Sequence, residues 1–303
     1  MTYYITGGFG FIGINLINYL YYEEKVKPSE IVVVERFDVE HRKKVMELTE
    51  SSNLFSHELN TTEFLNTQLK PSDIVIHLGA ISNTLENNAE KIYKNNTLYT
   101  LEIGKMTKKA HCKLIFISSA SVYGNMTDGQ INPLNNYAYS KYAAECLLKQ
   151  YKIPVVVLRL FNVYGLWERL KGNKMASVLT QNYYNTFYNK RVALFKDEEN
   201  SIKRDFVFVK DVCQIIYFFT TKFKPGIYDV GMGISSSFET MLSYAFHFFN
   251  FKPKIKHIKI PEHIINQYQF QTIADLYMLR KAGYGKKMTT LSEGVEITYD
   301  SYY

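Results

Sequence analysis

The stretch Ile5-Thr6-Gly7-Gly8-Phe9-Gly10-Phe11-Ile12-Gly13 decides the fold of this chain. It follows a short apolar run, Tyr3 to Thr6, and leads into an apolar helical pattern. Gly7 allows the tight turn after the strand, Gly10 lets the backbone approach a pyrophosphate, and Gly13 allows close packing of helix on strand. Because a helix N-terminus attracts phosphate, the stretch predicts a dinucleotide site formed by Gly7, Gly10, Phe11, Ile12 and Gly13.

A second apolar run supports this interpretation. Ile31 to Val34 is followed by Glu35, at about the ~20-residue spacing expected of the acidic residue that meets the adenosine ribose. A glycine turn with a purely structural role is the alternative. A strand before the turn and an acid at the end of the second strand both argue against that alternative.

The composition indicates a compact globular protein. Of its 303 residues, 46% are hydrophobic, 15% are aromatic and only 7 are prolines, which excludes a disordered or linker-rich chain. The net charge is +7 and the pI is near 9.0, but the basic residues are scattered apart from short clusters at 41–44 and 108–109. We therefore expect no nucleic-acid partner, since a basic cleft that attracts a pyrophosphate-bearing small molecule explains the charge equally well.

The cysteines and the beginning of the chain indicate the compartment. Cys112, Cys146 and Cys213 lack the spacing of metal ligands, so we expect reduced packing residues and no metal. The first strand begins almost at Met1, and no apolar run reaches the ~18 residues that a membrane span needs. These features predict a cytoplasmic protein with no signal peptide and no membrane partner.

Apolar runs alternate with helix-length amphipathic stretches, which predicts βαβ units and a doubly wound parallel sheet of the Rossmann type. Residues 1–165, with about 204–232, form the expected dinucleotide-binding domain, and 166–303 form a smaller interleaved domain. Asp211 is expected to cap a helix. The expected strands are 3–6, 31–34, 74–78, 114–118, 155–160, 204–209 and 226–230, and the expected helices are 90–108, 139–151 and 176–188.

A second group of residues carries chemistry. Tyr137 and Lys141 are spaced to share one helix face, and Ser119 ends a predicted buried strand. A lysine ammonium beside a tyrosine hydroxyl lowers the pKa of the phenol, which makes it a usable acid or base for an alcohol. Ser119 is then placed to hydrogen-bond the same substrate oxygen. A Tyr-x-x-x-Lys pair alone is common by chance, but its position after the strand-end serines favours a catalytic role.

These features resemble the extended short-chain dehydrogenase/reductases, which act largely on nucleotide sugars. Later segments narrow the resemblance to the ADP-L-glycero-D-manno-heptose 6-epimerase family, from Gly7 to about Gly294. Those segments are Phe161-Asn162-Val163-Tyr164-Gly165, Lys171-Gly172, Met175-Ala176-Ser177-Val178, Leu194-Phe195, Lys203-Arg204-Asp205-Phe206-Val207, Tyr268-Gln269 and Ala274-Asp275-Leu276.

The resemblance implies oxidation and re-reduction at C6 of a nucleotide-diphosphate heptose by a tightly held nicotinamide. It makes Tyr137 the first acid/base and Lys171 the second, and it implies heptose supply for lipopolysaccharide or another surface glycan, together with a homo-oligomeric state. The further cofactor contacts that it implies are Gly79, Ala80, Asn96 and Val163, and the substrate contacts are Ser82, Asn162, Lys174, Gln181, Phe195, Arg204 and Tyr268. An arginine at position 204 suits pyrophosphate, which a guanidinium binds bidentately, although an ion pair with Asp205 or Glu198 is the structural alternative.

The chain departs from the family pattern in five places. Arg169-Leu170 stands where a glycine and a histidine usually precede the lysine, and Lys174 is a one-residue insertion. Gln181 replaces a histidine, Lys196-Asp197 replaces Glu-Gly, and Leu166-Trp167 replaces Pro-Arg. These changes leave the redox residues in place but leave the nucleotide and the sugar open.

The cofactor signals are mixed. Glu35 favours NAD because a carboxylate binds the ribose 2′-hydroxyl and repels a 2′-phosphate. Arg36 follows directly, and Arg42 stands where the family has a lysine that can meet that phosphate. Since the family tends to prefer NADP, we expect NADP, with NAD as the alternative.

Other functions stay open at this point. A 4-epimerase or a GDP-heptose 4-dehydrogenase on the same fold is the main alternative. A 4,6-dehydratase is disfavoured because Ala120-Ser121 stands where such enzymes place an acidic pair. A non-catalytic dinucleotide sensor has no need of Ser119, Tyr137 and Lys141 together.

Overall fold

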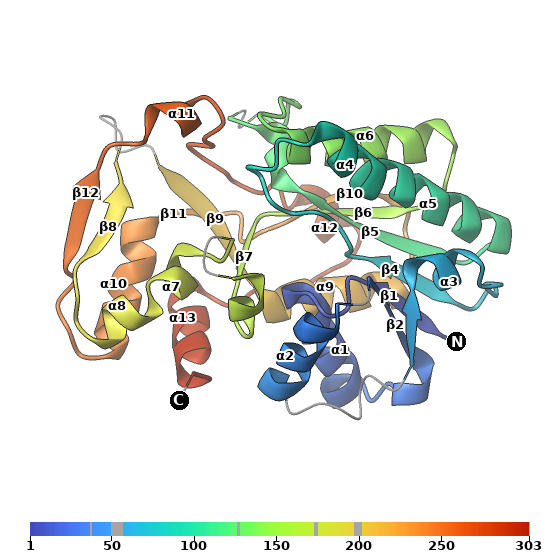
Figure 1. The fold of residues 1–303 in the computed structure, drawn as a ribbon, viewed down its shortest axis with the longest axis horizontal. Coiled ribbons are helices and arrows are strands. Elements are labelled where there is room, and N and C mark those ends of the chain that lie inside the picture. Colours follow the sequence, from blue (N-terminus) through green and yellow to red (C-terminus); the bar gives the residue numbers. More distant parts are fainter. Residues whose placement is uncertain (37, 50–56, 126–127, 173–174, 197–201, 303) are drawn as a thin grey trace. The chain divides into compact units, whose positions relative to one another are not determined.

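The computed structural model describes residues 1–36, 38–49, 57–125, 128–172, 175–196 and 202–302 (Figure 1). The chain divides into two compact units. Unit 1 comprises Met1–Ser119, Asn136–Arg159 and Cys213–Tyr228, and unit 2 comprises Ala120–Asn135, Leu160–Val212 and Asp229–Tyr303. Unit 2 thus includes 120–135, 160–165, 204–212 and 229–232, which were expected in the dinucleotide-binding domain.

A seven-stranded sheet forms the centre of unit 1. Its strands are β1 (Tyr3–Thr6), β2 (Ile31–Glu35), β3 (Glu58–Asn60), β4 (Ile74–His77), β5 (Lys113–Ser119), β6 (Val156–Leu160) and β10 (Gly226–Val230). Their order is β10-β6-β5-β4-β1-β2-β3, and each pair from β3 to β5 is parallel. The order reverses direction between β1 and β4, and ligands of doubly wound folds bind at such a point. The predicted fold class is confirmed.

Every side chain of β4 and β6 is buried, which explains why these strands are mostly apolar instead of alternating, with His77 and Arg159 as their buried polar residues. Helices cover both faces of the sheet (Figure 1). On one side lie α1 (Phe11–Asn18), α2 (Val39–Thr49) and α9 (Val209–Thr221), and on the other lie α4 (Ala89–Ile92), α5 (Tyr99–Ala110) and α6 (Asn136–Gln150). The short helix α3 (Thr61–Leu65) follows β3, and π-helical turns at Tyr19–Glu23 and Tyr93–Leu98 extend α1 and join α4 to α5.

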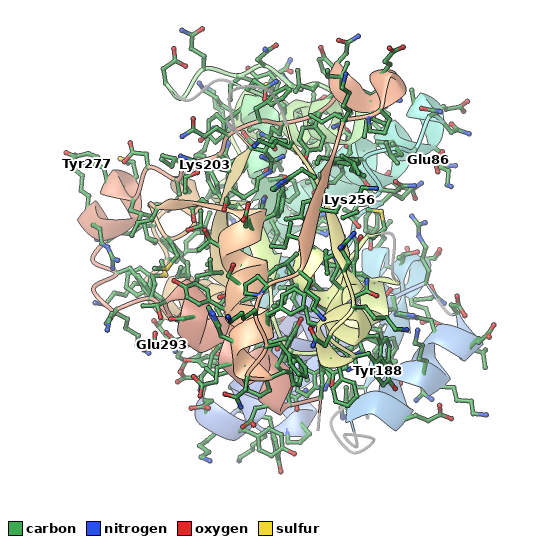
Figure 2. The ribbon with its side chains drawn as sticks, turned by 90° about the vertical axis from the view of Figure 1, so that its left-hand side faces the viewer. Glu86, Tyr188, Lys203, Lys256, Tyr277 and Glu293 are labelled. Atoms are coloured by element: carbon green, nitrogen blue, oxygen red, sulfur yellow. The ribbon has the colours of Figure 1, made fainter. Side chains whose placement is uncertain are left out.

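Unit 2 contains two smaller sheets. In one, β9 (Lys203–Phe208) lies between β7 (Asn162–Tyr164), which is parallel to it, and β11 (Ser235–Ser237), which is antiparallel. In the other, β8 (Val192–Phe195) pairs in parallel with β12 (Ile255–Ile258). Figure 2 looks onto the side of this unit where the exposed Lys256 lies on β12. Its helices are α7 (Val178–Gln181), α8 (Tyr183–Phe187), α10 (Phe238–Phe248), α11 (Glu262–Ile265), α12 (Tyr277–Lys281) and α13 (Leu291–Asp300).

Aromatic side chains build the core of unit 2. Tyr183 of α8 contacts the rings of Tyr299 and Tyr302 edge-on, with centroids 5.1 and 4.8 Å away. Tyr164 packs against Phe208 at 5.7 Å. Edge-on rings gain from the quadrupoles of the two π systems in addition to buried area. The many Tyr and Phe residues of the sequence therefore have a structural use here.

Three local expectations are wrong. The predicted helix at 176–188 is two short helices, because the chain leaves the helical conformation at Asn182. Asp211 does not cap a helix: it lies inside α9, and its carboxylate accepts the backbone N–H of Thr289 at 2.8 Å. Cys146 is exposed and is not a packing residue, although Cys112 and Cys213 are buried.

Gly13 provides a test of the turn geometry. A Cβ at this position would lie 2.4 Å from the carbonyl oxygen of Gly7 and 2.6 Å from Cα of Gly8, so Gly13→Ala forces the backbone apart. We expect a loss of about 1–3 kcal/mol in the free energy of unfolding, as for other overpacked sites, measured by urea denaturation. Gly285→Ala is the control because a Cβ there meets nothing within 4 Å. Equal stability of the two variants would contradict this description of the turn.

Candidate active site

The glycine turn brings the ends of β1 and β4 into close contact. Gly7 has a left-handed backbone, with φ +71°, and a Cβ there would lie 2.8 Å from the backbone of Gly79. Gly10 is the N-cap of α1 and has no side chain with which to cap the helix. Phe11 and Ile12 open the helix, so their N–H groups lie at its positive end. This arrangement leaves bare backbone where a pyrophosphate binds in such folds, and the residues therefore fit a dinucleotide.

Glu35 ends β2 and is tied to this turn by a hydrogen bond. Its carboxylate accepts the N–H of Phe9 at 3.0 Å and that of Arg36 at 3.2 Å. Burial raises the pKa of Glu35, and these two hydrogen bonds oppose the shift. The Arg36 guanidinium donates to the side-chain oxygen of Asn95. Glu35 therefore ties the glycine loop to the end of β2 as well as presenting an acid there.

Arg42 has a carboxylate partner. Its Nε lies 2.9 Å from both oxygens of Glu58, and its Nη2 lies 2.6 Å from Oε1. Glu58 begins β3, the edge strand next to β2. A bidentate pair of this kind neutralises the cation that the sequence analysis expected to meet a 2′-phosphate.

Asn96, the expected cofactor contact after β4, is fully buried and has other partners. Its side chain accepts the N–H of Ile81 at 2.8 Å, and it donates to the carbonyl of Ile81 and to Oγ of Ser140, each at 3.0 Å. It therefore fixes the segment that contains Ala80 and Ser82 against α6. Direct contacts of these three residues with a ligand stay predictions.

The serine, tyrosine and lysine predicted from the motifs lie together in unit 1. Ser119 ends β5 and hydrogen-bonds the hydroxyl of Tyr137. Lys141 is 2% exposed, donates to the carbonyl of Ile117 at 2.7 Å, and lies 4.8 Å from the ring centroid of Phe116. Burial lowers the pKa of Lys141 to about 7.

One part of the electrostatic expectation is wrong. Lys141 was expected to lower the pKa of Tyr137, but burial raises the pKa of this phenol, and the opposing influence is the hydrogen bond with Ser119. Burial costs the phenolate its hydration, and a donor at the phenolate oxygen recovers only part of that cost. Ser119 is thus the group that stabilises the ionised form of Tyr137.

Sequence reasoning missed a buried network beside Lys141. Glu145 lies one helical turn further along α6. Its carboxylate accepts hydrogen bonds from Oγ of Ser118 and from Nη2 of Arg159, each at 2.5 Å. All three side chains are buried, and the charge of Glu145 favours the ammonium form of Lys141. The spacing Lys141 to Glu145 was the available signal, whereas the partner on β6 lies too far along the chain to be read from a pattern.

A second missed residue is His77 at the end of β4. It is fully buried, and its ring nitrogens contact Oγ1 of Thr6 at 2.6 Å and Oγ1 of Thr100 at 2.9 Å. Burial lowers the pKa of His77 to about 3, so the ring is neutral at physiological pH. Thr6 also accepts the N–H of Gly79, so His77 helps to hold the glycine turn.

Arg204 lies in unit 2 and is 6% exposed. Its guanidinium donates to the backbone carbonyls of residues 203, 269 and 270 and lies 5.3 Å from the ring centroid of Tyr268. Asp205 is not its counter-ion, because this carboxylate accepts the N–H groups of Met232, Gly233 and Ala274. Among the described residues, the interactions of Arg204 are with neutral groups, as suits a site that receives an anion.

The other predicted substrate residues of unit 2 have separate surroundings. The ring of Phe195 lies 5.9 Å from that of Tyr268, edge-on. Asn162 and Val163 lie on β7, half-buried, and Gln181 donates to the carbonyl of Ala176 at 2.6 Å. Lys171 contacts Glu168 at 3.1 Å. Lys174 and Asp197 lie outside the described residues.

Two negative findings concern the described residues alone. None of their helices has both the length and the apolar character needed to cross a bilayer. In the same part of the chain, no three His, Cys, Asp or Glu side chains gather in a way that could hold a metal ion.

The glycine turn, the parallel sheet and the serine, tyrosine and lysine define an extended short-chain dehydrogenase/reductase fold. Residues 3–231 match the NAD dependent epimerase/dehydratase family, and the chain belongs to that family. It is 32% identical to an ADP-L-glycero-D-manno-heptose-6-epimerase of Brachyspira hyodysenteriae, over 96% of this chain and 95% of that protein.

Solved structures agree with this assignment. The Helicobacter pylori ADP-L-glycero-D-manno-heptose-6-epimerase superposes with a TM-score of 0.81 at 25% identity, covering 99% of this chain and 95% of that one. A UDP-glucuronic acid 4-epimerase from Bacillus cereus, in complex with UDP-glucuronic acid and NAD, has a TM-score of 0.79 at 21% identity, covering 99% and 98%. The latter likeness concerns the fold alone.

Lys141 gives a pH-dependent prediction for stability. Its pKa is about 7 in the folded protein and near 10.5 in the unfolded chain, so the unfolded state binds more protons between these values. The free energy of unfolding of the wild type should therefore rise with pH from 7 to 10, relative to Lys141→Met, by at most about 4 kcal/mol. Urea denaturation at several pH values measures this difference. Lys149→Met, an exposed position on the same helix, is the control, and parallel curves for wild type and Lys141→Met would refute the prediction.

Proposed function

We propose that this protein interconverts the D-glycero and L-glycero forms of ADP-D-manno-heptose at C6. The 32% identical heptose epimerase, matched along almost its full length, and the hydrogen bond between Ser119 and Tyr137 support the proposal. Cytoplasmic location, a homo-oligomeric state and heptose supply for a surface glycan follow from the same resemblance.

In this proposal, unit 1 holds the dinucleotide and unit 2 holds the nucleotide sugar. The glycine turn and Glu35 would hold the dinucleotide, which would supply the hydride chemistry at C6. In its phenolate form, Tyr137 takes the proton of the C6 hydroxyl as hydride leaves C6, and Ser119 holds the oxygen. Lys171 supplies or takes the proton for the opposite stereochemistry. Arg204 binds the diphosphate bidentately, since it is buried and its described contacts are with neutral groups.

The test follows C6 directly. Purified protein with no added cofactor is incubated with ADP-D-glycero-β-D-manno-heptose, and proton NMR records the stereochemistry at C6. We expect a mixture of both epimers, and we expect Tyr137→Phe and Lys171→Met each to lose at least about 100-fold in kcat, as for removal of a general acid or base. Unchanged substrate, together with turnover of another nucleotide sugar at C4, would reject the proposal in favour of a 4-epimerase or dehydrogenase.

For the cofactor we propose NAD in place of the NADP expected from the family's preference. Glu35 lies at the ribose end, and Glu58 holds Arg42 through two of its nitrogens. A 2′-phosphate would meet one carboxylate and find this cation already paired. The family match and the NAD-bound relative of the same fold agree with this choice.

Glu58→Gln tests the cofactor proposal. Removal of the carboxylate charge releases Arg42, so we expect the Kd for NADP to fall about tenfold while that for NAD changes less than about twofold, which corresponds to one charge-assisted contact of about 1.4 kcal/mol. Calorimetric titration of protein freed of bound dinucleotide measures both. Glu63→Gln serves as the control, since Glu63 accepts the N–H of Asn60 at the start of α3. NADP binding by the wild type that equals NAD binding would contradict the proposal.

A further inference from the structure

The short 3₁₀ turn Glu168–Lys171, here called the lysine turn, has an unusual set of anchors. It starts after Trp167, whose φ is +58°, and ends at Gly172, whose φ is +73°. A residue with positive φ on each side means that no helix or strand continues through the turn in either direction. The position of the turn is therefore determined by its side chains more than by a continuous helix or strand.

Glu168 is the first anchor and is fully buried. Its Oε1 accepts the N–H of Ser177 at 2.9 Å and Nζ of Lys171 at 3.1 Å. Its Oε2 accepts the hydroxyls of Ser177 at 2.5 Å and Thr180 at 2.7 Å. The carboxylate thus joins the lysine turn to the start of α7 and holds the ammonium of Lys171 with the same oxygen that accepts from the backbone.

Arg169 is the second anchor and points to another element. Its guanidinium carbon lies 3.6 Å from the ring centroid of Tyr302 and 4.8 Å from that of Tyr183. Tyr302 follows α13, and Tyr183 begins α8, so the cation joins two helices of the aromatic core. An arginine over aromatic faces is attracted by their quadrupoles, and its planar group can stack.

The two anchors are the consecutive residues Glu168 and Arg169, and their side chains contact different elements. Lys171 lies on this turn, with its side chain 29% exposed. A lysine side chain has four rotatable carbons and loses much rotamer freedom when its ammonium is fixed. A turn held on both sides, with a buried carboxylate beside the ammonium, removes that freedom before any ligand binds.

We propose that Glu168 and Arg169 are positioning residues that hold the ammonium of Lys171 in its working place. The inference rests on the proposed role of Lys171 as the second acid/base. It also accounts for Arg169, which stands where the family resemblance has a glycine: the aromatic residues Tyr183 and Tyr302 give that side chain a partner.

The first experiment needs no turnover. Lysines are dimethylated with ¹³C-formaldehyde, and the ¹H–¹³C resonance of Lys171 is assigned by its loss in Lys171→Met. We expect Glu168→Gln, Arg169→Met and Tyr302→Leu each to move that resonance toward the position of exposed lysines, while Tyr302→Phe, which keeps the ring, leaves it in place. Arg280→Met is the matched control. Arg280 is an exposed residue of α12, and its guanidinium carbon lies 5.8 Å from the ring centroid of Tyr284.

The second experiment separates positioning from general structure. With the heptose substrate, Arg169→Met should lower kcat roughly tenfold or more, since misplacing a catalytic group by about 1 Å costs on the order of 10²-fold, while KM changes less than about twofold. In a Lys171→Met background the same substitution should have no further effect on kcat, because it acts through the missing ammonium. Glu168→Gln should behave in the same way.

The outcomes are distinguishable. An unshifted Lys171 resonance in Glu168→Gln and Arg169→Met, or equal losses of kcat with and without Lys171, overturns the positioning proposal and leaves the epimerase proposal standing. Full activity of Lys171→Met removes the role of that lysine and with it this inference. A wild-type protein that leaves the substrate unchanged rejects the proposed function, whereas the resonance shifts still test whether the two anchors fix the ammonium.

Discussion

The close backbone contact between Gly7 and Gly79 is the constraint on which unit 1 depends. The two residues follow β1 and β4, the strands between which the sheet reverses its order. Any Cβ on Gly7 would overlap the backbone of Gly79. The neutral imidazole of His77, through Thr6, holds the same crossing. Phosphate binding by bare backbone is possible here because the strands are held together by hydrogen bonds beneath the loop and not by side chains within it.

Each unit buries a cationic side chain, and the two side chains differ in whether they can lose a proton. Lys141 is buried close to Glu145 and can lose its proton near neutral pH, since burial brings its pKa to about 7. Arg204 is buried among carbonyls and aromatic rings, and a guanidinium does not deprotonate in a protein. The lysine can therefore take part in proton transfer, whereas the arginine can only be neutralised by an anion. This difference fits the proposed roles, which are proton transfer beside Tyr137 for Lys141 and diphosphate binding for Arg204.

The sequence predicted the glycine turn, the parallel sheet and the grouping of Ser119 with Tyr137 and Lys141, because each follows a known pattern. It did not predict that Ser119 hydrogen-bonds Tyr137 directly. It did not reveal Glu145 with Arg159, or Arg42 with Glu58, since these pairs join different elements and neither partner is unusual by itself. It also missed β3, β7, β8, β11 and β12, which are strands of only three or four residues. Asp211 was misread because its true partner, Thr289, is distant in sequence.

The contacts of Gln181 and Arg169 explain two of the departures from the family pattern. Gln181 donates to the carbonyl of Ala176 in the segment that leads into α7, so this position supports a loop here. Arg169 stacks on two tyrosines of the core. Both changes lie within unit 2 and leave the hydrogen bonds of Ser119, Tyr137 and Lys141 in unit 1 untouched. Ser119, Tyr137 and Lys141 belong to unit 1 and the residues that differ belong to unit 2, so the proposed hydride chemistry can be kept while the contacts that hold the sugar change.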